Sequence, residues 1–593
     1  MDREKVKQRL IFWYSILWIL LIIALYLGYG VYFVDTISTK SKWIILFSSA
    51  VSLLLAACKF LEVSFYKYND EKLADKIKEQ NRANSIFYRY KNGVLFLFLA
   101  VFFIIFHKFI NTDCAICATV GVIIFSIASK LSSIVSLRGA IRAKDALLSS
   151  FNTSLKINFN SSVSVSFLYW ALLCSSSVIL YHIFKDYEVL IGFVFGVSLG
   201  AFFENLICAI SRKSLKNTDE FIQKYEHSND RSNPVLTLKN VVNNYNCSTF
   251  FEAFIIALSA SVVMGANSIG LMGSFLPLVV TANSMFISII VVLFSKINKT
   301  NNISKLFLKN AIIIVLLSSI LTYFELHYWL GKDFTCLSYS VLLGGILGIL
   351  SLFYNKDKNT VNEFQQIKKS ALKVIFAISA IVITFSASFL LNDGIEAVIF
   401  ALFGITLLAL GYNLIIIIAS CANQDVQLQK NASNYSNIST VLLVFSTIIA
   451  FIMVKELNEA DILNPIVMMS LFLGLLVPYI TNYICSNAIL KQAKDLILSS
   501  KKQIKNKEIK PDIIVLKSVR YSSSAAIFLI LGGCIILYLI SKFLGFEALV
   551  AFILGNAIAS CFLLFNKTTL SKINASFVRF FAIALLGLIV LFI

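Results

Sequence analysis

The chain carries little charge for its length and almost no proline. Only 14% of its 593 residues are charged, whereas 58% are hydrophobic, and the mean hydropathy is +0.81. Such a small number of charged side chains cannot cover the surface of a soluble domain of this size. The composition therefore indicates a polytopic membrane protein. With five prolines and 24 glycines, a long flexible or polyproline linker is excluded as well.

Metal-binding and redox motifs are also scarce. The four histidines are isolated and lack the spacing of a ligand set. The eleven cysteines lie mostly within apolar runs, and the C-x-x-C pair formed by Cys114 and Cys117 has no second pair to complete a metal site. We therefore interpret the cysteines as small apolar helix residues rather than as redox groups or metal ligands.

Long apolar segments dominate what is present. We count about seventeen, each of roughly 17 to 28 residues, the length needed to cross a hydrocarbon core of ~30 Å. The runs are continuous rather than alternating, which predicts an all-α polytopic membrane protein with about 17 transmembrane helices. The first run is too long for a signal peptide, so we expect a retained helix. The segments lie near 11–34, 43–65, 94–110, 114–137, 162–184, 187–211, 250–266, 270–295, 306–330, 335–354, 371–391, 394–421, 438–455, 462–487, 523–543, 546–565 and 575–593.

Basic residues are distributed unequally between the connections. With the N-terminus on the cytoplasmic side, about forty lysines and arginines fall in cytoplasmic connections, against five outside: Lys40, Lys42, Lys185, Lys332 and Lys455. This asymmetry predicts a cytoplasmic N-terminus and an external C-terminus. The basic residues are spread over many short segments, so nucleic acid is not an expected partner. The longest connections on the cytoplasmic face, where we expect any site, are 66–93, 138–161, 212–249 and 488–522.

One stretch at the membrane boundary has a distinctive spacing. "KNVVNNYNC" places Lys239, Asn243 and Cys247 at every fourth position, on one face of a helix. The stretches "SRKSLKNTDEFIQKYE" and "DRSNP" precede it. Together they resemble the signature region of the membrane-integral pyrophosphatases, the pyrophosphate-energised proton and sodium pumps. The positions that match the family pattern are Lys213, Lys224, Glu226, Asp230, Asn233, Pro234, Asn240, Val241 and Asn244, followed later by Lys510, Pro511 and Asp512.

The resemblance implies a fold and a setting. Residues 43–593 are expected to form the sixteen-helix bundle of these pumps, and residues 1–42 a tail and one extra N-terminal helix. The family is a homodimer in membrane lipid, with its active site on the cytoplasmic face and Mg²⁺ as cofactor. We expect the membrane to be a bacterial-type inner membrane.

The chain departs from the family where the chemistry is performed. Three aspartates that hold Mg²⁺ in the family fall on Lys239, Asn243 and Cys247, and the first signature aspartate falls on Lys216. An ammonium repels Mg²⁺, a carboxamide is a weaker ligand, and a thiol is too soft. We therefore expect no bound Mg²⁺ and no working catalytic site. What remains is a remnant pyrophosphate site at Lys213, Glu220, Lys224, Glu226, Asn240, Asn244, Lys510 and Asp512.

The ion pathway implied by the resemblance is altered too. Its arginine falls on Asn205, and its aspartate and glutamate fall on Phe254 and Ala257. Glu204, beside Asn205, lies well inside an apolar segment, and we expect it to face the bundle interior; a functional and a structural role stay equally open. The first hypothesis is therefore a family member that neither hydrolyses pyrophosphate nor pumps ions.

Two alternatives stay open. A divergent active pump would use substitute ligands, namely Asp219, Glu220, Asp230 and Asp512. An unrelated multi-pass transporter would use intramembrane carboxylates, namely Glu62, Glu204, Glu252, Glu325 and Glu396. For Glu62, Glu325 and Glu396 we favour a structural role at the end of a segment, where the carboxylate reaches the membrane–water interface. Basic residues at the cytoplasmic face, namely Arg212, Lys213, Lys216, Lys224 and Lys239, permit an anionic ligand such as a phosphate or a lipid headgroup, although we favour a solvated, positively charged loop.

Overall fold

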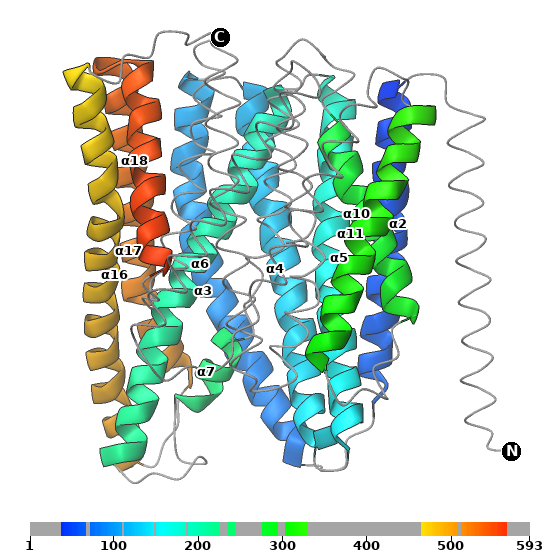
Figure 1. The fold of residues 1–593 in the computed structure, drawn as a ribbon. Coiled ribbons are helices and arrows are strands. Elements are labelled where there is room, and N and C mark those ends of the chain that lie inside the picture. Colours follow the sequence, from blue (N-terminus) through cyan, green and yellow to red (C-terminus); the bar gives the residue numbers. More distant parts are fainter. Residues whose placement is uncertain are drawn as a thin grey trace, which may run out of the picture.

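The computed structural model describes residues 37–66, 72–109, 112–147, 150–185, 188–225, 235–243, 275–294, 303–329, 464–506 and 511–565. These residues form a bundle of long, roughly aligned helices without strands (Figure 1). The helices are α2 (Ile37–Ser64), α3 (Lys72–Phe109), α4 (Thr112–Leu147), α5 (Phe151–Phe184), α6 (Glu188–Tyr225), α7 (Leu236–Asn243), α10 (Leu276–Phe294), α11 (Ile303–Phe324), the π turn η2 (Glu325–Trp329), α16 (Pro465–Asn506), α17 (Pro511–Phe543) and α18 (Phe546–Phe565).

The apolar runs account for these helices. Each expected segment that falls largely within the described residues forms one helix. Seven of the described helices are long and apolar enough to cross a membrane: α2, α4, α5, α6, α10, α16 and α17. An all-helical membrane protein is thus confirmed for this part of the chain, whereas the total of about seventeen stays a prediction. The segments near 11–34, 250–266, 335–354, 371–391, 394–421, 438–455 and 575–593 lie outside the described residues.

Local sequence fixes several helix boundaries. Pro465 and Pro511 each open a helix, at the position where a missing backbone N–H costs nothing. The side chain of Asn464 caps α16 by accepting a hydrogen bond of 3.0 Å from the backbone N–H of Ile466. Gly545, with φ of 87°, makes the tight turn between α17 and α18 that a residue with a Cβ rarely adopts.

The long connections that we expected as loops on the cytoplasmic face are helical over most of their described length. α16 has 42 residues, and its length of about 63 Å is roughly twice the hydrocarbon thickness. α3 and α6, with 38 residues each, also run well beyond their apolar segments. The physical reason is that hydropathy reports only which part of a helix prefers lipid. Helices with few helix-breaking residues continue into water.

The helix ends that carry these connections meet at one end of the bundle (Figure 1, lower end). Arg82 near the start of α3 lies 3.4 Å from Asp512 near the start of α17. Between α16 and α6, the side-chain amide of Gln492 donates a hydrogen bond of 3.4 Å to the hydroxyl of Ser211. The connections 66–93 and 488–522 therefore lie on the same side, as the basic-residue count predicts.

Glycine allows two pairs of helices to touch backbone to backbone. A Cβ added to Gly196 of α6 would lie 1.9 Å from the carbonyl oxygen of Ala118 in α4. A Cβ on Gly474 of α16 would lie equally close to the carbonyl oxygen of Phe552 in α18. Small residues drive helix association in membranes because they permit this close packing. The α4–α6 contact fixes the depth at which polar groups on these two helices face each other.

Candidate functional site

Two polar clusters lie along helix α6. Glu204 lies in its apolar part, and Asp219 lies in the part that continues toward the lower end of the bundle. Their separation of fifteen positions corresponds to about 22 Å along the helix axis. One cluster is thus within the apolar bundle and the other at the end that carries the basic connections.

The cluster at the lower end joins α6 to the short helix α7. Lys239 of α7 donates a hydrogen bond of 2.5 Å to the Asp219 carboxylate. The Asp219 side chain is only 3% exposed and that of Lys239 is 28% exposed. Gln223, one turn further along α6, donates to the other Asp219 oxygen at 3.3 Å. The Lys239 ammonium therefore neutralises a buried carboxylate.

Apolar packing holds α7 in the position that allows this contact. Leu238, Val241 and Val242 are almost fully buried, at 0 to 1% exposure, on a helix of eight residues. Thr237 ties α7 to α3 by donating a hydrogen bond of 3.0 Å to Glu79. With its apolar side packed, the helix presents Lys239 toward α6.

Two other carboxylates at this end also pair with cations of the chain. Glu220 lies 3.6 Å from Lys216, one turn before it on α6, and both side chains are more than half exposed. Asp512 is the carboxylate that pairs with Arg82. Asp219, Glu220 and Asp512 are the substitute metal ligands of an active pump that lie within the described residues. Each of them is thus paired with a lysine or an arginine.

These residues do not fit a magnesium ion. Magnesium requires several oxygen ligands at octahedral positions, and carboxylates supply the negative charge that holds it. Here Asp219, Glu220 and Asp512 each face a positive side chain, and Lys239 adds a positive charge where the family resemblance places an aspartate.

The structure brings together only part of the expected remnant site. Lys213, Lys216, Glu220 and Lys224 lie on α6, and Asn240 lies on α7 beside Lys239. Asn243 ends α7, one turn after Lys239, as the four-residue spacing predicts. The expected positions outside the described residues are Glu226, Asp230, Asn233, Pro234, Asn244, Cys247, Glu252, Phe254, Ala257, Glu396 and Lys510.

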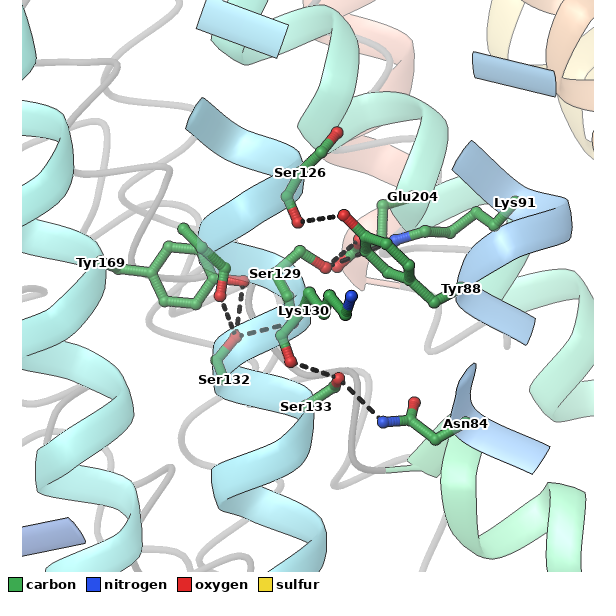
Figure 2. Close-up of polar contacts among 11 residues, drawn as sticks. Asn84, Tyr88, Lys91, Ser126, Ser129, Lys130, Ser132, Ser133, Tyr169 and Glu204 are labelled. Atoms are coloured by element: carbon green, nitrogen blue, oxygen red, sulfur yellow. Dashed lines mark hydrogen bonds and ion pairs between the residues drawn. The ribbon is translucent and has the colours of Figure 1, made fainter. Parts of the chain in front are cut away.

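The second cluster is a buried ion pair between α3 and α6 (Figure 2). Lys91 of α3 donates to Glu204 of α6, and their side chains are 1% and 6% exposed. Ser129 of α4 donates to the same Glu204 oxygen at 2.5 Å and accepts a hydrogen bond of 3.3 Å from Lys91. Three helices therefore converge on one carboxylate oxygen.

Further polar contacts align α3 with α4 on either side of the ion pair. Tyr88 donates to the backbone carbonyl of Ser126 at 3.0 Å, and the centre of its ring lies 5.6 Å from the Lys91 nitrogen. Asn84 donates to Ser133 at 3.1 Å. Figure 2 shows these side chains projecting toward each other from the two helices. The contacts fix the register in which Lys91 meets Ser129.

Sequence reasoning found Glu204 but missed its partner. Lys91 counts among the cytoplasmic basic residues in the connection 66–93, yet it is fully buried in α3. A signal was present, because Asn84, Tyr88 and Lys91 follow the i, i+4, i+7 spacing of one helix face. The expectation that Glu204 faces the bundle interior is confirmed, since the residue is 4% exposed. Asn205, the expected pathway position beside it, is also on α6 and partly buried.

Two further candidate carboxylates, Glu62 and Glu325, lie within the described residues and differ in burial. Glu62 is 46% exposed and contacts Lys59 at 2.8 Å, in agreement with the expected position at a segment end. Glu325 is 1% exposed and accepts a hydrogen bond from the amide of Asn283 on α10, so its expected position at the interface is wrong. Asn283 also donates to Thr322 at 3.2 Å. The position of Glu325 near the end of its apolar segment predicted an exposed carboxylate, because it contains no information on the packing of α10 against this residue.

Comparison with known proteins supports the family. The family model described as "Inorganic H+ pyrophosphatase" matches residues 50–422. A "Putative K(+)-stimulated pyrophosphate-energized sodium pump" from Clostridium tetani (strain Massachusetts / E88) is 23% identical over 482 residues, covering 70% of this chain and 70% of the relative. The matched range contains both clusters on α6. Together with the bundle of apolar helices, this establishes that the chain belongs to the inorganic H⁺ pyrophosphatase family of membrane proteins.

Proposed function

We propose that this chain is a pyrophosphatase-family membrane protein that does not hydrolyse pyrophosphate and therefore does not use it to pump ions. The observation that carries the proposal is the contact between Lys239 and Asp219. It places a positive charge on a buried carboxylate, in the region where the resemblance expects carboxylates that hold Mg²⁺.

Electrostatics makes this contact incompatible with the family chemistry. Hydrolysis of pyrophosphate needs bound metal, a positioned water and a carboxylate that accepts its proton. A single unit charge about 4 Å away contributes about 4 kcal/mol at an effective dielectric constant of about 20. The Lys239 ammonium opposes a divalent cation by an amount of this order, while Asp219 is already neutralised by the ion pair.

The expected setting is part of the proposal. The basic ends of α3, α6, α16 and α17 support a cytoplasmic location for the lower end of the bundle, with the N-terminus inside and the C-terminus outside. The family resemblance supports a homodimer in a bacterial-type inner membrane, a sixteen-helix bundle over residues 43–593 and one additional helix within residues 1–42. Any anionic ligand at this end competes with the carboxylates that already engage Lys216 and Lys239.

A divergent active pump is the second candidate. It is favoured by the Clostridium tetani relative, whose printed name describes a pyrophosphate-energised sodium pump and which spans most of this chain. This candidate requires Glu220, Asp219 or Asp512 to leave their cationic partners and to bind metal. An unrelated transporter is excluded, because the chain belongs to the pyrophosphatase family.

The test is phosphate release from pyrophosphate by the purified protein in detergent with Mg²⁺ present. We expect no release above that of a preparation without the protein. The variant Lys239→Asp/Asn243→Asp/Cys247→Asp is expected to stay inactive, because Lys216 still replaces a signature aspartate. Steady Mg²⁺-dependent release by the unmodified protein, lost in Glu220→Gln, would refute our proposal and favour the divergent active pump.

A further inference from the structure

The Lys91 ammonium lies where the oxygen atoms of two other helices meet. Its nitrogen contacts the Glu204 carboxylate and, at 3.3 Å, the hydroxyl oxygen of Ser129. We propose that Glu204 and Ser129 form a monovalent-cation site within the membrane bundle, and that the Lys91 side chain occupies this site as a tethered cation. Removal of the lysine would then open the site to an alkali metal ion.

The directions of the hydrogen bonds support this assignment. The Ser129 hydroxyl uses its single proton toward Glu204, at 2.5 Å. Its oxygen lone pairs are therefore left to accept from Lys91, and the carboxylate oxygen accepts from both donors. The ammonium thus faces a carboxylate oxygen and a hydroxyl oxygen, and oxygen atoms are the ligands that hard metal cations prefer.

Burial makes a positive charge necessary at this position as long as Glu204 is ionised. The Glu204 side chain is 6% exposed, and its neighbours on α6, Phe203 and Leu206, are fully buried. An ionised carboxylate in such surroundings is costly unless a positive charge accompanies it. Lys91 provides this charge from within the chain, so the site holds its cation whatever salt is present.

A tether explains why an external ion would not displace the lysine. A group attached to the same molecule competes at an effective concentration in the millimolar range for short flexible linkers, and the Lys91 ammonium also makes charge-assisted hydrogen bonds that a metal ion does not make. Hydrogen bonds of Asn84 and Tyr88 to α4 further hold α3 in the register that aims Lys91 at Glu204. The unmodified protein should therefore show no preference among monovalent cations in its stability.

The experiment compares thermal unfolding of the full-length protein in choline, sodium and potassium chloride at equal ionic strength. Lys91→Met leaves the carboxylate and hydroxyl in place without the ammonium. A ligand that binds only the folded state raises the apparent melting temperature. We expect this variant to be less stable than the unmodified protein in choline, and to gain ~2 °C or more in saturating sodium or potassium.

Matched variants separate this site from other effects of salt. Lys91→Arg keeps the positive charge, and Lys91→Met/Glu204→Gln removes the negative one, so neither should respond to the choice of cation. Equal melting temperatures of Lys91→Met in all three salts would overturn the proposal, since Glu204 would then be accommodated by a proton.

Failure of Lys91→Met to fold in every salt, while the double variant folds, would also overturn it. If both variants fail to fold, Lys91→Gln replaces Lys91→Met, because its amide still donates to Glu204 without supplying charge. A gain in sodium or potassium supports the proposal, and equal stability in all three salts contradicts it. This readout is independent of pyrophosphate hydrolysis.

Discussion

Lys239 and Asp219 lie twenty residues apart on different helices, and their side chains meet at 2.5 Å. The pair joins α7 to α6 at the end of the bundle where the family resemblance places a metal-dependent site. An ion pair at this position binds the two helices together, whereas separate carboxylates would repel each other. The consequences can be measured in stability as well as in activity.

Replacement of Lys239 should cost far more stability than replacement of Lys216. Lys239→Met removes the ammonium from the buried Asp219 carboxylate and leaves Gln223 as a neutral donor, so we expect a loss of about 2–4 kcal/mol. Lys216 also pairs with a carboxylate on α6, but both partners are exposed, so Lys216→Met should change stability by less than about 0.5 kcal/mol. Unfolding in mixed detergent micelles measures both. Equal losses would show that the Lys239–Asp219 pair is not buried.

The backbone contact between α4 and α6 should not tolerate a larger side chain. Gly196→Ala places a methyl group 1.9 Å from the carbonyl oxygen of Ala118, so the helices must separate. Forcing extra volume into a packed interface costs typically about 1–3 kcal/mol. Gly532 is the control, because a Cβ there meets no atom within 4 Å.

Gly532→Ala should leave the protein as stable as before, or stabilise it by up to about 1 kcal/mol through helix propensity. Thermal unfolding of the two alanine variants in the same detergent compares them directly. A Gly196→Ala protein as stable as the Gly532→Ala protein would contradict the close α4–α6 packing.

The amide of Asn283 should contribute much more to stability than the hydroxyl of Ser284. Asn283→Leu removes a donor to Glu325 and to Thr322, and leaving buried oxygens without it should cost about 1–3 kcal/mol. Ser284 is buried next to Asn283, but its hydroxyl makes no hydrogen bond within the described part of the chain. Ser284→Ala should therefore be nearly neutral in the same unfolding measurement.

The described ends of the bundle should be accessible from opposite sides of the membrane. Single cysteines in place of Lys78 on α3 and Lys502 on α16, both exposed at the lower end, should react with a membrane-impermeant maleimide only from the cytoplasmic side. A cysteine in place of Lys542, at the opposite end of α17, should react only from outside. Labelling of the unmodified chain supplies the background. Reaction of the first two positions from opposite sides would contradict the bundle.

Sequence by itself determined the class of the protein and much of its architecture. Transfer of an apolar side chain into lipid is favourable wherever it stands in the chain, so local composition is enough to find a membrane helix. The basic residues likewise predicted that 66–93 and 488–522 lie on one side. The spacing of "KNVVNNYNC" indicated a helix, and its Lys239 and Asn243 do lie on α7.

Only the tertiary structure decided which charges meet. Lys91 and Glu204 are 113 residues apart, and Asn283 and Glu325 are 42 apart, so each pairing depends on which faces of distant helices pack together. A count of basic residues cannot distinguish Lys91 from a solvated lysine, because the count does not show that α3 begins at Lys72 and that Lys91 lies inside the bundle. The depth of Glu204, the burial of Glu325 and the neutralisation of Asp219 all follow from packing. Packing is a relation between segments, whereas hydropathy is a property of one segment.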